Sequence, residues 1–299
     1  MIPSRYTRLS ETAVFLYYAL VCLFIAIFRR RIALWESLLI AQSAALLIAM
    51  IVVGIAEAFP RSSLLALVRN WLPLPAVLFG YRMALSLINC ERNRGFLPDR
   101  DAVLIGIDRL IFGCDPTVWL ERISSPWLTE ILQIAYAANY FLPLALVLLL
   151  YVKRRRIPFQ FSVCLLTIGY FLSYLGYFLV PAIGPRFTLT HACALKGVFL
   201  GDTLGRLIYF MESCPRDCFP SGHTELPLIT LYLAFRFRRR LFWIYLPIVV
   251  LLISSTVYLR YHYVIDVLAG AGTAAMVILL GHFILRTEKR EAEREYGGV

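Results

Sequence analysis

Long apolar runs recur along this chain of 299 residues, and only short polar segments separate them. A helix needs roughly 20 apolar residues to cross the hydrocarbon core of a bilayer while its backbone groups bond to one another. With 60% hydrophobic and 16% charged residues, the chain has more such helices than one soluble domain could bury. The sequence therefore predicts an all-α protein, a polytopic transmembrane helical bundle in the lipid bilayer.

We expect about eight spans, the first of them uncleaved because no small-residue cleavage site follows it. The apolar piece Ala102–Phe112, between the third and fourth spans, is too short to cross a bilayer and fits an interfacial or re-entrant helix. The expected spans are Ala13–Phe28, Ala33–Ile55, Trp71–Ile88, Leu128–Tyr151, Phe159–Val180, Thr224–Phe235, Leu241–Tyr258 and Val264–Leu285.

These spans divide the chain into three expected parts. Residues 1–60 form an N-terminal transmembrane helix pair, and residues 61–285 form a larger membrane domain with a six-helix core. Residues 286–299 form a charged cytoplasmic tail.

The formal net charge of +11 resides in short basic clusters beside apolar runs. This pattern is typical of membrane-flanking loops, so we expect no nucleic-acid partner. Lys153–Arg156, Arg236–Arg240 and the tail predict one cytoplasmic side. Pro181–Ser221 and Leu259–His262 then share the non-cytoplasmic face, which is periplasmic, extracellular or lumenal. Arg29–Arg31 breaks this scheme, because eight spans place it on that same outer face.

Polar residues with a chemical pattern gather in these outer segments. In the run Pro-Ser-Gly-His that ends at His223, Ser221 can start a helix and Gly222 lets a ligand approach the backbone. The free N–H groups and the dipole of a helix N-terminus favour an anion. The run therefore predicts an anion site faced by His223.

His262 and Asp266 are four residues apart, so they share one face of a helix. The carboxylate can accept a hydrogen bond from one imidazole nitrogen, which leaves the other nitrogen as a nucleophile. His223 would then protonate a leaving oxygen. Arg186 and Arg260 are forked cationic donors that can hold phosphate oxygens, although each arginine alone could equally be a snorkelling side chain.

These residues resemble the type 2 phosphatidic acid phosphatase superfamily, whose members carry an arginine-containing first motif, a Pro-Ser-Gly-His motif and a third motif ending His-x-x-x-Asp. The segment Ile107–Gly113 followed by Asp115-Pro116, together with Val180–Phe187, resembles the inositol phosphorylceramide synthase branch, a group of sphingolipid enzymes. The resemblance covers about Leu104–Gly281 and leaves the first two spans outside.

The resemblance implies a phosphatase-type membrane core and a phosphohistidine mechanism without metal or other cofactor. In it His262 attacks phosphorus, Asp266 supports it, His223 acts as acid and then base, and Arg186 holds phosphate with Ser221 and Gly222. The chain departs from the family pattern at three positions: Leu179 replaces a lysine, Phe187 a proline, and Thr256 an arginine for which Arg260 could substitute.

The outer segments also contain Cys193, Cys214 and Cys218, beside His191. An oxidising exterior favours a disulfide among them, while free thiols and a zinc site are the alternatives.

Three functions fit the sequence. The first is a phosphotransferase that moves a phosphate-bearing head group from a membrane lipid to a lipid alcohol such as ceramide or diacylglycerol. The second is a lipid phosphate phosphatase that uses water instead. The third, a non-enzymatic lipid transporter, fits less well, because a permeation path would place charges at mid-span and not at span ends.

Overall fold

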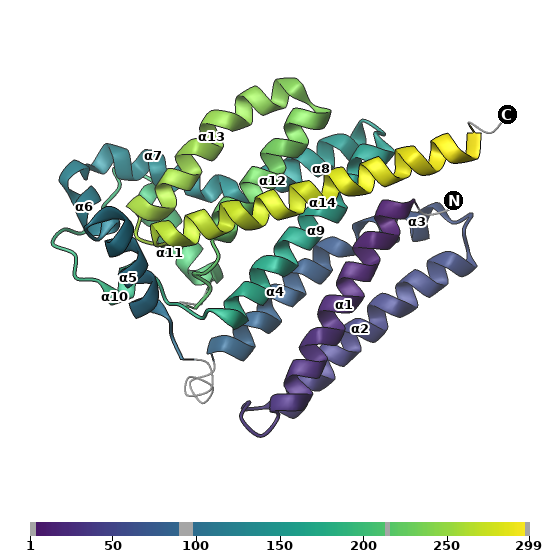
Figure 1. Ribbon diagram of the computed structural model, residues 1–299, viewed down its shortest axis with the longest axis horizontal. Coiled ribbons are helices and arrows are strands. Elements are labelled where there is room, and N and C mark those ends of the chain that lie inside the picture. Colours follow the sequence, from purple (N-terminus) through teal and green to yellow (C-terminus); the bar gives the residue numbers. More distant parts are fainter. Residues whose placement is uncertain (1–3, 90–97, 213–215, 297–299) are drawn as a thin grey trace.

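The computed structural model describes residues 4–89, 98–212 and 216–296. Within these ranges every regular element is helical, apart from one isolated parallel β-bridge between Ala182 and Asp217. The predicted all-α fold is therefore confirmed, and Figure 1 shows the long helices lying side by side in a bundle.

The elements follow one another without any separate non-helical domain in the described ranges. They are α1 (Arg5–Phe28), α2 (Trp35–Ala58), α3 (Ser63–Trp71), α4 (Pro73–Asn89), α5 (Asp101–Phe112), α6 (Pro116–Trp119), η2 (Leu120–Ile123), α7 (Pro126–Ala137), η3 (Ala138–Tyr140), α8 (Leu142–Val152), α9 (Arg156–Leu179), α10 (Pro185–Thr188), α11 (Gly201–Glu212), α12 (Gly222–Phe237), α13 (Arg239–Tyr258) and α14 (Val264–Tyr296).

Six helical stretches in the described residues are long and apolar enough to cross a membrane, and the pair α7 and α8, bent by 45°, makes a seventh if it is one span. Each of the eight expected spans coincides with one of these stretches or with α12. The difference lies in α12, which has 16 residues. At about 1.5 Å per residue it is shorter than the roughly 30 Å hydrocarbon core. The chain is a multi-pass membrane protein.

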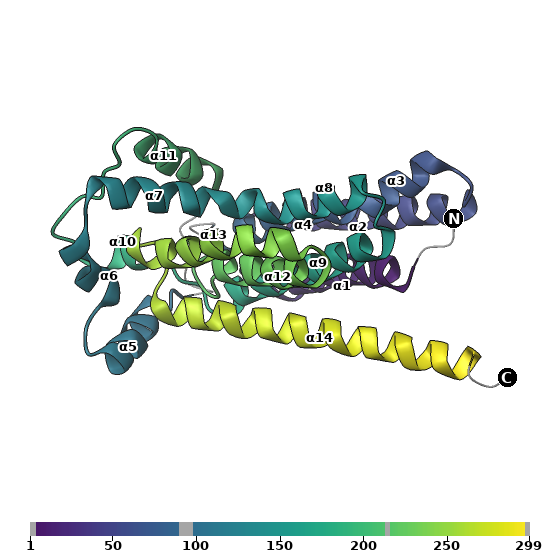
Figure 2. The ribbon, with the colours of Figure 1, turned by 90° about the horizontal axis from the view of Figure 1, so that it is seen from above.

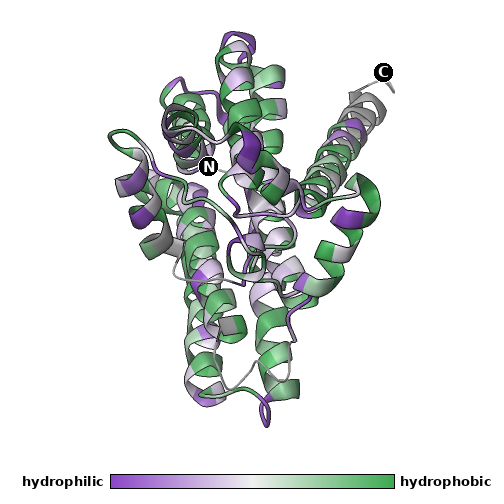
Figure 3. Cartoon of the chain, turned by 90° about the vertical axis from the view of Figure 1, so that its left-hand side faces the viewer, coloured by the Kyte–Doolittle hydropathy of each residue, from purple (hydrophilic) through white to green (hydrophobic). Residues whose placement is uncertain are grey.

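Apolar side chains point outward over much of the bundle, as expected of helices that face lipid. Leu16, Ile40 and Trp243 are 58%, 70% and 63% exposed. Figure 3 shows hydrophobic residues along the helices and hydrophilic residues in short patches.

Two apolar clusters form the interior. One joins α1, α2, α4 and α9, and the other joins α8, α9, α12, α13 and α14, so α9 belongs to both. Ring pairs along α9 set the direction of α1: Tyr6 contacts Phe161 near the start of α9, and Phe24 contacts Phe178 near its end. The expected N-terminal helix pair therefore packs directly on the rest of the bundle.

The basic clusters and the motif segments lie at opposite ends of the bundle. Lys153–Arg156 precedes α9 and Arg236–Arg240 joins α12 to α13, whereas the predicted motifs follow α9 and precede α12 and α14. In Figure 2 α5, α6 and α11 lie at one end, and the C-terminus lies at the other. Because α1 runs parallel to α9, Arg29–Arg31 lies at the motif end, as the sequence predicted for eight spans.

The short helix α5 lies at the motif end, where an interfacial helix was expected from the segment 102–112. It ends at Gly113, which has a φ of 69° and donates its N–H to the Arg109 carbonyl. A residue with a side chain rarely adopts this backbone, so glycine stops the helix here. Leu110, Ile111 and Phe112 remain exposed, as expected at a membrane interface.

Gly176 gives a test of the packing between α9 and the motif end. A methyl group at Gly176 would overlap the ring of Pro220, the residue before Ser221. Gly176→Ala should therefore destabilise the protein by about 1–3 kcal/mol, the usual cost of overpacking. Thermal unfolding in detergent micelles, followed by tryptophan fluorescence, would measure this change.

The matched control is Gly54→Ala in α2, where an added methyl group meets no atom within 4 Å. Alanine favours a helix over glycine by up to about 1 kcal/mol, so the control should unfold at an unchanged or higher temperature. Equal unfolding temperatures for the two variants would contradict the packing described here.

Candidate active site

Backbone hydrogen bonds join the three predicted motif segments at one end of the bundle. The Arg186 N–H donates to the Arg260 carbonyl over 3.0 Å, and the Ser221 N–H donates to the Asp266 carbonyl over 3.1 Å. The Cys218 N–H also donates to the Ala182 carbonyl. Segments that are up to 80 residues apart in sequence thus form one site (Arg186 to Asp266).

Asp266 lies in the first turn of α14, whereas His262 lies two residues before this helix. The expected shared helical face is therefore wrong, but the turn before α14 still brings the two side chains together. His262 is buried, and its Nδ1 lies 3.5 Å from Oδ2 of the fully buried Asp266, at the outer limit of a hydrogen bond. The same Oδ2 accepts the Tyr263 N–H and the Cys218 thiol, each over 2.8 Å. The carboxylate is therefore fixed on the Nδ1 side of the ring, which leaves Nε2 for chemistry.

His223 occupies the first turn of α12, directly across from His262. The two imidazole centroids are 5.8 Å apart. The Tyr136 ring stacks on His223 at 4.4 Å, and its hydroxyl lies 3.4 Å from Nδ1 of His223. The structure thus brings together the two histidines that the sequence singled out.

Ser221 and Gly222 form the start of α12, as predicted. Ser221 is the N-cap residue, is fully buried, and accepts a hydrogen bond from the Thr224 hydroxyl. A methyl group on Gly222 would come within 3.1 Å of the Tyr177 hydroxyl, so glycine allows α9 to approach closely here. The N–H groups of this first helical turn lie beside His223, where the helix dipole favours an anion.

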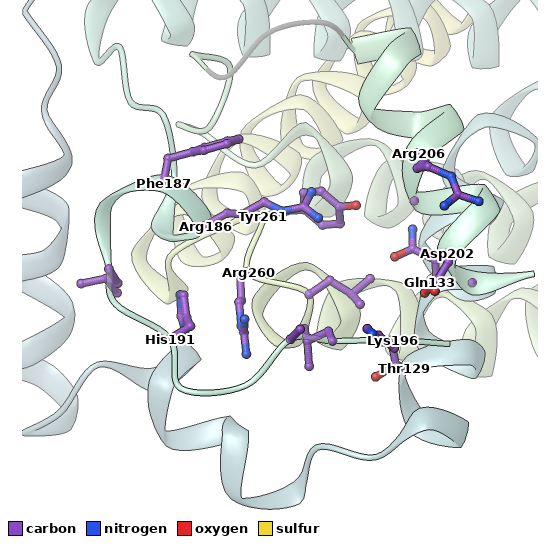
Figure 4. Close-up of a pocket in the computed structure, with 16 residues that line it drawn as sticks. Thr129, Gln133, Arg186, Phe187, His191, Lys196, Asp202, Arg206, Arg260 and Tyr261 are labelled. Atoms are coloured by element: carbon purple, nitrogen blue, oxygen red, sulfur yellow. The ribbon is translucent and has the colours of Figure 1, made fainter. Parts of the chain in front are cut away.

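The two arginines have different surroundings. Arg186 is exposed, and its guanidinium lies over the Tyr261 ring at 5.3 Å. Arg260 is buried and donates to Glu121 over 2.9 Å, while His191 contacts the same carboxylate oxygen at 3.0 Å. In Figure 4 the Arg260 side chain extends away from Arg186. Arg186 is therefore accessible to a ligand, whereas Arg260 is held by an ion pair.

The family comparison agrees with this geometry. A family model described as the PAP2 superfamily matches residues 104–280, which is more than half of the chain and contains all three motif segments. The chain belongs to the PAP2 superfamily. Neither the comparison with curated proteins nor that with solved structures found a match. The resemblance seen in the sequence is thus confirmed for the superfamily, while the inositol phosphorylceramide synthase branch stays a prediction.

The cysteines of this PAP2 domain do not pair as far as the structure describes them. Cys193 and Cys218 are both free thiols, and Cys214 lies outside the described residues. Cys193 lies beside the Arg260 guanidinium at 3.5 Å, whereas Cys218 contacts Asp266. The expected disulfide is therefore not formed between Cys193 and Cys218.

Cys218, His262 and Asp266 also have the composition of a metal site, since their ligand atoms lie within 4.8 Å of one another. A thiol binds a metal ion as the thiolate. Burial, with the negative charge of Asp266, raises the pKa of the Cys218 thiol well above its ordinary value. In the structure the Cys218 thiol donates its hydrogen to Asp266 over 2.8 Å.

Two aspartates of α5 complete the candidate site, and neither had been predicted as part of it. Asp101 accepts the Ile183 and Gly184 N–H groups and the Tyr263 hydroxyl, over 3.0, 2.9 and 2.8 Å. Asp108 accepts the N–H groups of Val264 and Ile265, each over 2.9 Å, and so caps α14. Burial raises the pKa of the Asp108 carboxyl. Two acids seven residues apart in a short apolar helix were the sequence signal for this role.

The capping of α14 by Asp108 can be tested by substitution, with Asp115 of the same region as the control. Asp108→Asn retains only one acceptor oxygen for two backbone donors, so it should lower stability by about 1–3 kcal/mol. It should also lower turnover, because the helix start that it holds carries Asp266. Thermal unfolding and lipid phosphate turnover of the purified protein would measure the two effects.

Asp115→Asn is the matched control. Asp115 pairs with Arg109, whose side chain is 57% exposed, and exposed ion pairs contribute little to stability. If Asp115→Asn were as damaging as Asp108→Asn, the capping role of Asp108 would be wrong.

Proposed function

We propose that this PAP2 protein is a lipid phosphotransferase that works through a phosphohistidine on His262. The observation that carries the proposal is the buried His262–Asp266 pair facing His223 across 5.8 Å. A phosphorus centre with its oxygens can bridge such a gap, with a nucleophile on one side and a proton donor on the other. Asp266 stabilises the charge that develops on the His262 ring.

In the first step His262 Nε2 attacks the phosphorus of a lipid phosphate. The N–P bond forms as the bond from phosphorus to the leaving oxygen breaks. Protonated His223 donates its proton to that oxygen, so the leaving group departs as a neutral alcohol. His223 is left neutral, ready to accept a proton.

In the second step an acceptor hydroxyl attacks the phosphorus of the phosphohistidine. His223 takes the hydroxyl proton as the new O–P bond forms and the N–P bond breaks. Both histidines return to their starting states, so the same pair serves each turnover. The residue roles are the same whether the acceptor is a lipid alcohol or water.

Arg186 is the residue that we assign to the non-bridging phosphate oxygens, together with the backbone at Ser221 and Gly222. Its exposed guanidinium is a forked donor, and a helix N-terminus favours an anion. Arg260 could hold phosphate only by leaving Glu121, so we propose that it anchors the segment before His262 instead. Arg260 lies in the turn between α13 and α14, and its φ of 67° is a left-handed backbone conformation that suits a turn.

Transfer to a lipid alcohol, as in the inositol phosphorylceramide synthase branch, is supported by two observations. Asp108, from the segment that resembles this branch, caps the helix of Asp266. A cavity beside Arg186 also has room for the head group that a donor lipid of this branch carries. Hydrolysis by a lipid phosphate phosphatase is the alternative, since water can replace the alcohol.

The proposal places the reaction on the non-cytoplasmic face, because the basic clusters lie at the end of the bundle opposite to the histidines. Residues 61–285 form the catalytic membrane domain in this proposal, and residues 1–60 and 286–299 are the added helix pair and the cytoplasmic tail. A lipid transporter is not favoured, because the charged site residues cluster at the ends of spans.

Removing either histidine should strongly lower turnover of radiolabelled phosphatidic acid. His262→Ala should lose activity by at least about 1,000-fold and form no labelled enzyme. His223→Ala should lose about 100- to 10,000-fold, the usual contribution of a general acid and base. Label retained on the protein after alkaline quenching would measure the phosphohistidine.

His282→Ala is the matched control, since His282 lies further along α14 and contacts the Ile278 carbonyl. It should keep normal turnover. Near-normal activity in either His262→Ala or His223→Ala would overturn the mechanism.

Transfer and hydrolysis can be separated with one added acceptor. Purified protein would be incubated with labelled phospholipid, with and without ceramide or diacylglycerol. Transfer predicts a labelled lipid product and less free phosphate when the acceptor is present. Phosphate release unaffected by the acceptor would sink the transferase proposal and leave the phosphatase.

A further inference from the structure

A cavity of about 790 Å³ opens beside Arg186, and neither His223 nor His262 is among the residues that line it. Its walls come from α7, from α11, from the segment after Arg186 and from the turn before His262. In Figure 4 Arg186 and Tyr261 lie across the cavity from Asp202 and Arg206. The volume is that of a small-molecule site and far exceeds what one phosphate needs.

The cavity wall is cationic. Arg186, Lys196 and Arg206 line it, and none of them has an ion-pair partner within the described residues. The lining carboxylate, Asp202, accepts the Gly197 N–H over 2.8 Å. Asp202 contributes one negative charge and Arg186, Lys196 and Arg206 contribute three positive charges, so the wall has a net positive charge. Such a wall favours a ligand with more than one negative charge.

Two buried donors also line the cavity without a hydrogen-bond partner. They are Nε2 of Gln133, whose residue is 5% exposed, and Nε of Arg260, whose residue is 9% exposed. A buried donor that has lost water and gained no acceptor is costly, so such groups usually meet a ligand or water. The Gln133 amide lies against Gly205 of α11, at the wall that bears Arg206.

The wall is held in place independently of any ligand. The Glu130 carboxylate of α7 accepts four consecutive N–H groups, those of residues 198–201, over 2.8–3.1 Å. These residues follow Lys196 and lead into α11. Lys196 and Arg206 are therefore carried by a loop and a helix that Glu130 holds in place.

We propose that this cavity binds a polyol head group that carries a further phosphate, beyond the phosphorus that is attacked. Arg186 belongs to both places: it lines the cavity and holds the reacting phosphate in the mechanism above. Lys196 and Arg206 take the second phosphate. Gln133 donates to head-group oxygens, and so does Nε of Arg260, while Nη2 of Arg260 keeps its bond to Glu121. That the head group belongs to a lipid rests on the proposed function. That the cavity binds the free head group rests on the cavity alone.

Binding is tested with inositol bisphosphate as the probe, by calorimetry on the full chain in detergent. All proteins carry His262→Ala so that no probe is turned over. The double variant Lys196→Gln/Arg206→Gln should bind inositol bisphosphate at least about tenfold more weakly, since each lost contact is charge-assisted. Inositol monophosphate should be affected much less.

Arg100→Gln/Arg122→Gln is the matched control, because both arginines are exposed, near the same end of the molecule and outside the cavity. It should bind the bisphosphate as the parent does. Equal affinity of the Lys196→Gln/Arg206→Gln variant and this control for inositol bisphosphate would overturn the proposal, and so would absence of measurable binding to the parent.

Turnover decides the source of the head group. With His262 restored, Lys196→Gln/Arg206→Gln should lower kcat/KM for phosphatidylinositol phosphate about tenfold relative to phosphatidylinositol. Weaker binding of the soluble bisphosphate without this change would assign the cavity to a soluble ligand with the same second phosphate. If the parent turned over no lipid, the proposed function would fail, while the binding experiment would still decide the cavity.

Discussion

The buried carboxylate of Asp266 is the centre on which the motif end of this bundle depends. A carboxylate without water needs hydrogen-bond donors, and Oδ2 of Asp266 receives two, from the Tyr263 N–H and the Cys218 thiol, beside the His262 ring. The Asp266 backbone carbonyl accepts the Ser221 N–H as well. One residue thereby fixes the segments that carry both histidines, through its side chain and its main chain.

The helix α5 extends this network to the exposed edge of the motif end. Its apolar side faces outward, while Asp101 and Asp108 point inward to backbone donors of the first and third motifs. A side-chain carboxylate has two acceptor oxygens, so it can accept one hydrogen bond from each of two adjacent N–H groups, whereas a backbone carbonyl has a single oxygen. A short helix with exposed apolar residues therefore orders a site formed from the ends of longer helices.

Local sequence patterns were enough to predict the helices and the position of the central histidines. Apolar run length predicted the helices, and the four-residue spacing predicted the contact of His262 with Asp266. The ion pair of Arg260 with Glu121 could not be predicted in this way, because 139 residues separate the partners. The packing of Tyr136 on His223 and the cavity beside Arg186 likewise arise from tertiary contacts that leave no periodic signal.

The Glu130 carboxylate accepts four backbone N–H groups, and this determines which residues can change the ligand preference of the cavity. A run of consecutive backbone N–H groups is itself an anion-binding device, but here an internal carboxylate already fills it. The charge offered to a ligand at this wall therefore depends on side chains such as Lys196 and Arg206. Substitutions of Lys196 or Arg206 can therefore change which ligand the cavity prefers without disturbing the backbone or the segments that hold the histidines.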